Sequence, residues 1–267
     1  MNPSRPRKRF GQHFLTDTRV IDRLVAAIDP KPGQRIIEIG PGRGALTAPV
    51  LGRCGGLEVV ELDRDLASSL AERLSHPAGL VVHQDDALSF DFGQRAGGEP
   101  LRVIGNLPYN ISTPLIFHLL GQSEALSDLH FMLQKEVVDR LVASPGGRQY
   151  GRLTVMAGFH CRMERLFDVG PAAFDPPPAV DSAVIRLVPK RLSQDDRDLL
   201  PALDRVVRSG FGKRRKTLRN SLRGMIDPDR IDALGIDPSA RPETLDLDQF
   251  RALAGLIEPD KAQSAFR

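Results

Sequence analysis

The sequence predicts an α/β fold, a mostly parallel sheet with helices on both faces, followed by a small all-helical C-terminal domain. Short apolar runs alternate with helically spaced segments through most of the chain. Glycine-rich or polar turns directly follow several of these runs, as at the carboxyl ends of parallel strands. Beyond Pro189 only helical patterns continue. The predicted domains are therefore residues 1–190 and 191–267.

Composition is that of a protein with a substantial core, because 41% of the 267 residues are hydrophobic and 27% are charged. No apolar run approaches the roughly 20 residues that a membrane span requires. The first residues are basic but lack the apolar segment of a signal peptide. The two cysteines, Cys54 and Cys161, lie in no ligand-like cluster, which argues against a disulfide scaffold or a cysteine zinc site. We expect a cytoplasmic protein with reduced thiols and no membrane contact.

The expected elements follow in chain order. Strands are predicted at residues 35–39, 57–60, 80–82, 101–104, 130–133 and 180–187. Helices are predicted from a cap at Asp17 to Ile28, at 45–51, at 64–74 after a cap at Asp63, after Pro114, and up to Val142. Residues 152–160 fit a helix or a strand equally well, and three prolines make 174–178 a stiff loop.

Polar and glycine residues stand at the ends of the first three predicted strands. Gly40, Gly42 and Gly44 let the backbone pass close to a ligand before a helix begins. Glu61, 21 residues past Gly40, fits an acceptor for a ribose diol, and Asp86 fits an acceptor for the exocyclic amine of adenine. Each feature alone is equally explained by a helix cap or an ordinary turn. Their order at three successive strand ends predicts a nucleoside cofactor, either a nicotinamide dinucleotide or S-adenosylmethionine.

The residues that follow the fourth predicted strand distinguish between these two cofactors. Pro108 keeps Leu107 extended, so the Leu107 carbonyl and the Asn106 side-chain oxygen can accept from a planar amine beside the Tyr109 ring. Phe174 is predicted to hold the other face of a base that has left its stack, although a core position is the alternative. No acid or base suited to hydride transfer is evident. The predicted reaction is methyl transfer to an amine such as N6 of adenine, with catalytic residues Asn106, Leu107, Pro108, Tyr109 and Phe174.

Basic residues gather in two clusters on a chain whose net charge is only +3. The clusters are Arg7, Lys8 and Arg9, and Lys213, Arg214, Arg215, Lys216, Arg219 and Arg223. Leu218 and Leu222 are spaced to face inward on a helix, which would turn neighbouring cations outward. We expect both clusters to contact RNA phosphates; solvated surface is the alternative.

Several segments together resemble the bacterial small-subunit (16S) ribosomal RNA adenine N6,N6-dimethyltransferase family. They are residues 8–16, 38–42, 61–63, 84–87, 106–109, 174–182 and 211–222. The resemblance implies a Rossmann-like class I methyltransferase domain with a seven-stranded sheet. It implies dimethylation of two adjacent adenosines near the 3′ end of 16S RNA, in the 30S subunit or its late precursor, by a monomer with a role in subunit biogenesis. The donor would be S-adenosylmethionine, the product S-adenosylhomocysteine, and no metal would take part.

The resemblance also implies a set of donor-binding residues. They are His13, Leu15, Gly40, Gly42, Glu61, Leu62, Asp86, Ala87 and Asn106. His13 departs from the family pattern, since many members carry Asn there, and simple packing is its alternative role. Other interpretations are a large-subunit ribosomal RNA or DNA adenine methyltransferase, or an assembly factor without catalysis. The basic motif at 211–222 and the three-proline loop favour the small-subunit enzyme.

Overall fold

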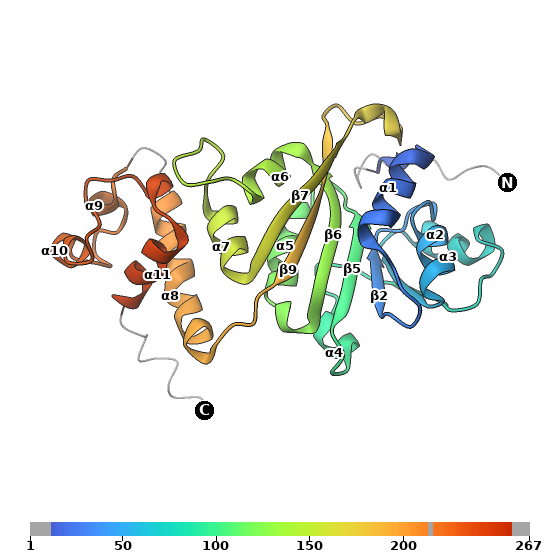
Figure 1. The fold of residues 1–267 in the computed structure, drawn as a ribbon, viewed down its shortest axis with the longest axis horizontal. Helices are drawn as coiled ribbons and strands as arrows, with labels where there is room; N and C mark the ends of the chain where they lie inside the picture. The colour runs from blue at the N-terminus through green and yellow to red at the C-terminus, as the bar shows by residue number, and fades with distance from the viewer. Residues whose placement is uncertain (1–11, 213–215, 258–267) are drawn as a thin grey trace. The chain divides into compact units, whose positions relative to one another are not determined.

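The computed structural model describes residues 12–212 and 216–257 (Figure 1). This part of the chain forms two compact units. The first contains the chain up to Asp139 together with Cys161–Pro189, and the second contains Arg140–His160 together with the chain from Lys190 on. Residues 140–160, which the sequence analysis placed in the first domain, are grouped with the helical unit because α7 (Arg152–His160) packs against α8 and α11.

A seven-stranded sheet in the order β4-β3-β2-β5-β6-β9-β7 organises the first unit. The first five strands in this order are parallel, and β9 and β7 continue the sheet antiparallel, which confirms the predicted fold class. The strands are β2 (Ile36–Ile39), β3 (Leu57–Glu61), β4 (Leu80–Gln84), β5 (Leu101–Asn106), β6 (Leu126–Gln134), β7 (Cys161–Val169) and β9 (Ser182–Pro189). The strand β7 was not expected from the sequence.

Helices cover both faces of this sheet, with α1 in front and α5 behind in Figure 1. The helices of the first unit are α1 (Thr18–Ile28), α2 (Thr47–Cys54), α3 (Arg64–Arg73), α4 (Phe92–Ala96) and α5 (Ser112–Leu120). Helix α6 (Lys135–Leu141) follows β6. Short 3-10 helices occupy Ser123–Ala125 and Pro171–Ala173.

A small two-stranded ladder joins the N-terminal segment to the three-proline region. In it β1 (Phe14–Leu15) pairs antiparallel with β8 (Phe174–Asp175), so that Leu15 lies opposite Phe174. The sequence predicted only a stiff loop at 174–178. Two residues of that loop instead add a strand, because β1, 159 or more residues earlier, lies beside them.

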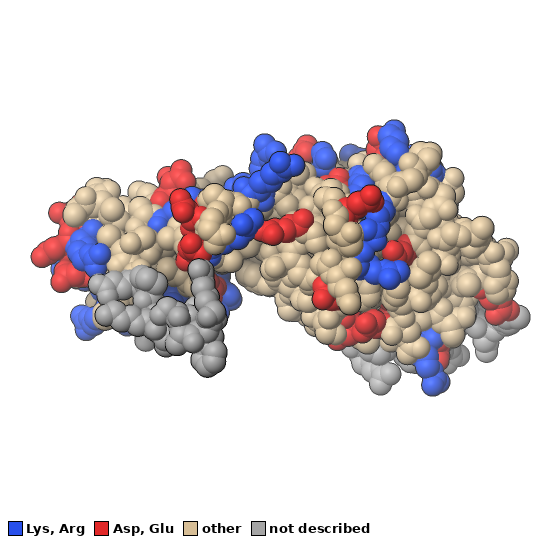
Figure 2. All heavy atoms as spheres, turned by 90° about the horizontal axis from the view of Figure 1, so that it is seen from below, with Lys and Arg blue, Asp and Glu red and all other residues tan. Residues whose placement is uncertain are grey.

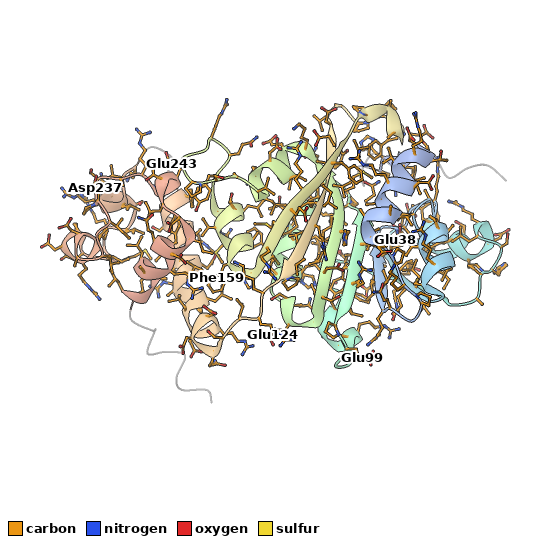
Figure 3. All side chains as sticks on the ribbon, viewed as in Figure 1. Glu38, Glu99, Glu124, Phe159, Asp237 and Glu243 are labelled. Atoms are coloured by element: carbon orange, nitrogen blue, oxygen red, sulfur yellow. The ribbon has the colours of Figure 1, made fainter. Side chains whose placement is uncertain are left out.

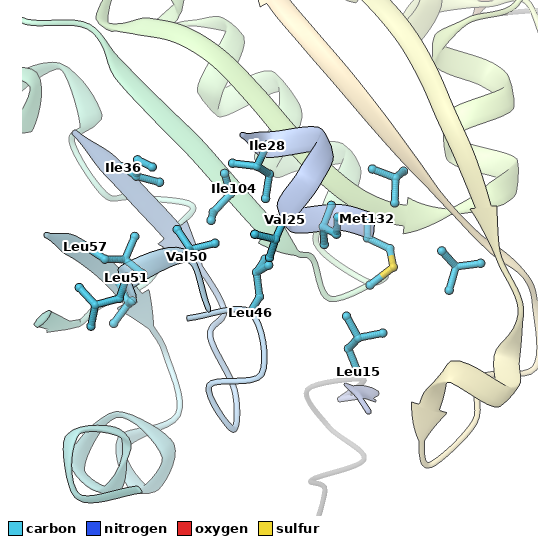
Figure 4. Close-up of a cluster of buried hydrophobic side chains, with 14 of the residues drawn as sticks. Leu15, Val25, Ile28, Ile36, Leu46, Val50, Leu51, Leu57, Ile104 and Met132 are labelled. Carbon is cyan, nitrogen blue, oxygen red and sulfur yellow. The ribbon is translucent and has the colours of Figure 1, made fainter. Parts of the chain in front are cut away.

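The main apolar core of the first unit lies between α1, α2 and the sheet (Figure 4). Leu24, Val25 and Ile28 of α1 are almost fully buried against it. Ile104 and Met132 project from β5 and β6 into the same cluster. The Asp17 side chain caps α1 as predicted, accepting from the Arg19 and Val20 N–H groups at 2.9 and 3.3 Å. Because α1 is packed in this core and Asp17 caps its first turn, the segment just before α1 is held close to the sheet.

The second unit is helical. Its elements are α7, α8 (Gln194–Phe211), α9 (Leu218–Ser221), α10 (Pro228–Asp232), a 3-10 turn at Pro242–Thr244 and α11 (Leu247–Gly255). Capping boxes at Ser193 and Asp246 begin α8 and α11. Within the described ranges, no helix is long and apolar enough to cross a membrane.

Candidate active site

A cavity lies at the carboxyl edge of the sheet in the first unit. Its wall comes from five segments, within residues 12–15, 38–46, 60–66, 85–87 and 106–111. All nine predicted donor-binding residues line it, as do Leu107, Pro108 and Tyr109. Open α/β sheets bind ligands at this edge, because the strand ends and following turns leave a crevice there. The structure therefore brings the separate strand-end motifs into one site.

The glycine turn after β2 passes through left-handed backbone. The φ angles of Gly40 and Gly42 are +66° and +57°, a region that favours glycine. A Cβ on Gly42 would lie 3.1 Å from the Phe14 ring, tighter than ordinary packing allows. The turn thus needs glycine both for its backbone and for its approach to the N-terminal segment.

Glu61, at the end of β3, is held by backbone N–H groups. Its two carboxylate oxygens accept from Asp63 N at 2.9 Å and Gly42 N at 3.2 Å. Burial raises the pKa of Glu61, although these N–H groups oppose the shift. The next side chain, Leu62, is 51% exposed although it is a large apolar group in the cavity wall. Glu61 and Leu62 together offer an acceptor for hydroxyls and an apolar surface for a flat ring.

Asp86 follows β4 and is held by its own turn. One carboxylate oxygen accepts from Leu88 N at 2.9 Å. Within the described ranges no donor reaches its other oxygen, which can accept from a ligand in the cavity. Ala87 beside it is buried.

Residues 106–109, named here the acceptor turn, follow β5. Asn106 donates from Nδ2 to the His13 backbone carbonyl at 3.0 Å, so its Oδ1 is the end left to accept. The Leu107 N–H donates to the Met132 carbonyl at 3.1 Å. No described residue donates to Asn106 Oδ1 or to the Leu107 carbonyl. The turn can therefore offer two acceptors to an amine.

The Tyr109 ring beside these acceptors is fixed by contacts from distant segments. Its hydroxyl and that of Ser182 are hydrogen-bonded at 2.7 Å. The His13 ring stacks on it with centroids 5.5 Å apart and planes 29° apart. His13 Nδ1 in turn donates to the Pro176 carbonyl at 2.8 Å, since a carbonyl can only accept. A flat aromatic group thus stands next to the two acceptors.

Comparison with known proteins decides what this site belongs to. The sequence profile described as "Ribosomal RNA adenine dimethylase" matches residues 4–258. The chain belongs to this family. It is an S-adenosylmethionine-dependent methyltransferase.

Several relatives carry the name "Ribosomal RNA small subunit methyltransferase A", including those of Acinetobacter baylyi and Pseudomonas putida. That of Acinetobacter baylyi is 55% identical over 258 residues, covering 95% of this chain and 93% of its own length. That of Pseudomonas putida is 55% identical over 253 residues, covering 94% of each chain. Similar solved structures include a dimethyladenosine transferase from Plasmodium falciparum (TM-score 0.79, 25% identity, 92% of this chain and 99% of that one). Another is the 23S rRNA methyltransferase ErmE (TM-score 0.72, 25% identity, 92% and 100%).

The cavity of this family member fits the methyl donor. It combines a glycine turn in left-handed backbone, the carboxylate oxygens of Glu61 as acceptors for hydroxyls, and the exposed apolar Leu62. It also contains Glu38, which the sequence analysis did not single out as a site residue. The contact of each residue with the donor stays a prediction.

Glu38 lies in β2 and lines the cavity with a side chain that is 2% exposed (Figure 3). Its Oε2 finds no hydrogen-bond partner within the described ranges. Burial, helped by the nearby charge of Glu61, raises the pKa of Glu38 to about 8. One signal could have revealed it: a lone carboxylate in an otherwise apolar strand, Ile36-Ile37-Glu38-Ile39.

Phe174 does not lie where the acceptor-site prediction needs it. Its side chain is 4% exposed, belongs to the apolar core and does not line the cavity. Pairing with Leu15 turns it inward, and strand alternation turns Asp175 outward. In this structure Phe174 is a core residue, which was the alternative to a role in base stacking.

The described basic residues of the second cluster lie on the surface of the second unit. Lys216, Arg219 and Arg223 are exposed, whereas Leu218 and Leu222 are fully buried, as their spacing predicted. The remaining predicted RNA contacts, Arg7, Lys8, Arg9, Lys213, Arg214 and Arg215, lie outside the described residues. On the face drawn in Figure 2, basic and acidic side chains are interspersed. In the part of the chain that is described, no three His, Cys, Asp or Glu side chains form a group able to hold a metal ion.

Proposed function

We propose that this enzyme dimethylates N6 of two adjacent adenosines near the 3′ end of 16S ribosomal RNA in the 30S subunit. The observation that supports the chemistry is that Asn106 and Leu107 line the same cavity as the predicted donor-binding residues, and that no described residue donates to Asn106 Oδ1 or to the Leu107 carbonyl. The small subunit is supported as the substrate by relatives that are named small-subunit methyltransferases. Their identity of about 55% extends over nearly the whole chain. We expect the enzyme to act as a cytoplasmic monomer.

The donor would be held on three strand ends. Glu61 would accept from the ribose hydroxyls, Asp86 from the amine of the donor adenine, and Leu62 would cover the ring. Gly40 and Gly42 would let the donor lie close to the protein backbone. His13, Leu15 and Ala87 would complete the wall of the binding site. When bound, S-adenosylmethionine supplies a methyl group made electrophilic by its sulfonium.

The acceptor turn would prepare the adenine amine. The N6 lone pair of adenine is delocalised into the ring and reacts poorly. Acceptance of both N6 hydrogens by Asn106 and Leu107 favours a pyramidal nitrogen whose lone pair is available outside the ring plane. The contribution of the protein is then position and electrostatics, and no dedicated base is needed.

Tyr109 would support the base after it leaves its stack in the RNA. His13 lies against one face of the Tyr109 ring, so a base would use the opposite face. Stacking of this kind contributes roughly 1–3 kcal/mol per base. The exposed cations Lys216, Arg219 and Arg223 of the second unit would bind RNA phosphates and take no part in the chemistry.

Mass mapping of modified adenosines tests this proposal. Unmethylated 30S subunits incubated with enzyme and S-adenosylmethionine should gain two adjacent dimethyladenosines near the 3′ end of 16S RNA. Unmethylated 50S subunits serve as the matched control and should gain no dimethyladenosine. Methylation confined to 50S subunits would overturn the substrate, and donor binding without methylation of any RNA would favour an assembly factor.

A further inference from the structure

The hydroxyl of Tyr109 has a single hydrogen-bond partner among the described residues, the hydroxyl of Ser182, at 2.7 Å. Ser182 is the first residue of β9 and is completely buried. No other hydrogen bond of the Ser182 side chain is found within the described ranges. One hydroxyl donates and the other accepts, so removal of either leaves the remaining hydroxyl without this partner in a largely desolvated place.

The backbone of Ser182 is already fixed without its side chain. Ser182 lies opposite Gln134 of β6 and Val169 of β7 in the sheet. The preceding residue, Asp181, accepts from Lys135 N at 2.9 Å. The ladder would hold an alanine at position 182 equally well. The Ser182 hydroxyl is thus not required for the strand, and its contact reaches outward to the acceptor turn.

Tyr109 needs such a contact, because its ring is the part of the acceptor turn that can rotate. The Tyr109 backbone is held by Ser112, whose Oγ donates to the Tyr109 carbonyl at 3.1 Å. His13 limits one face of the ring. Among the described residues, only Ser182 makes a hydrogen bond to the hydroxyl at the far end of the side chain. A small rotation of the side chain displaces this end the most.

We propose that Ser182 is a positioning residue that sets the angle of the Tyr109 ring for the target adenine. This inference rests on the proposed role of Tyr109 as the stacking surface. The hydroxyl-to-hydroxyl bond holds the ring in one orientation before RNA binds, so less ordering remains to be done when the base enters. Ser182 does not line the cavity, so its effect on the reaction would pass through Tyr109.

A double-mutant cycle tests this role. We expect Ser182→Ala and Tyr109→Phe each to lower kcat/KM for unmethylated 30S subunits by about threefold to tenfold, the worth of one hydrogen bond. The double variant should fall no further than either single variant, because both remove the same bond. Donor affinity, measured by calorimetry, should stay within about twofold of wild type. Ser123→Ala is the matched control, a buried serine outside the cavity wall that should leave kcat/KM unchanged.

Each outcome decides between positioning and mere packing. Wild-type kcat/KM in Tyr109→Phe overturns the proposal, even where Ser182→Ala fails to fold, and so do additive losses or a matching loss of donor affinity. If wild-type enzyme methylates only another ribosomal RNA, the substrate assignment fails, and the same cycle on that RNA still tests Ser182. A wild-type enzyme inactive on every RNA overturns both.

Discussion

The two sides of the cavity are organised in different ways. On the donor side, acidic side chains at the ends of β3 and β4 accept hydrogen bonds from backbone N–H groups. Glu61 accepts from residues 2 and 19 positions away, and Asp86 accepts from a residue 2 positions away. On the acceptor side, Asn106 is held from 93 positions away and Tyr109 from 73. In the proposed function, donor binding would therefore depend on these turns, whereas acceptor geometry would depend on contacts across the first unit.

The largest expected effect is on the acceptor side. Asn106→Ala should lower methylation of 30S subunits by about a hundredfold or more, the usual cost of removing a preorganised group that acts in the transition state. Donor affinity by calorimetry should change much less than the rate, although Asn106 is also among the predicted donor-binding residues, because Glu61 and Asp86 remain. Asn106→Asp keeps the acceptor but loses the donor to the His13 carbonyl, so its rate should be intermediate. Near-normal turnover of Asn106→Ala would remove Asn106 from the reaction.

The second prediction concerns Glu38, a buried carboxylate of the cavity wall whose Oε2 has no hydrogen-bond partner among the described residues. Glu38 has a folded-state pKa of about 8, above the ordinary 4.5, so between these values the folded protein binds the extra proton. Stability of the donor-free enzyme should therefore fall as pH rises through this window, by about 2 kcal/mol between pH 6 and pH 8 from Glu38 alone. Urea unfolding of wild type and Glu38→Gln at both pH values isolates this contribution, because the other titrating groups are shared. An equal pH dependence in both proteins would contradict it.

The third prediction should move donor binding and spare the acceptor. Glu61→Ala should raise the Kd for S-adenosylmethionine about tenfold or more, because charge-assisted hydrogen bonds are worth roughly 1.5–3 kcal/mol. Turnover at saturating donor should fall much less. Glu58→Gln is the matched control on the same strand: Glu58 pairs with His83 and Arg95 and does not line the cavity. Unchanged donor affinity in Glu61→Ala would mean that Glu61 only shapes the end of β3.

The smallest effect is expected from the exposed cations of the second unit. Changing Lys216, Arg219 and Arg223 to alanine should weaken 30S binding and flatten its salt dependence, by about 0.7–0.9 in log–log slope for each phosphate that is no longer bound. Donor affinity should not move. Arg230→Ala, an exposed arginine of α10 outside the cluster, is the control. An unchanged slope in the triple variant would leave these residues as solvated surface.

The same contrast separates what could and could not be predicted from the sequence. The succession of strands and helices along the chain, the glycine turn and the acids at strand ends follow from local periodicity and from the rule that ligands bind where parallel strands end. Seven of the nine predicted donor residues lie at or just after strand ends and line the cavity; His13 and Leu15 also line it, but they lie in the N-terminal segment and were predicted from the family resemblance. Glu38 was missed as a site residue because it could be read as an ordinary member of the strand and of the motif at 38–42. Only the structure shows that its carboxylate is buried in the cavity wall.

The sequence by itself determined the parallel sheet and the strand-end segments, including residues 106–109, that line the cavity. Only the tertiary structure decided that β1 pairs with β8, which buries Phe174, and that His13 and Ser182 close on Tyr109. It also decided that residues 140–160 pack with the helical unit. The physical reason is range: periodicity reports contacts within a helix or strand, whereas these contacts join residues 73 to 163 positions apart through the packed core.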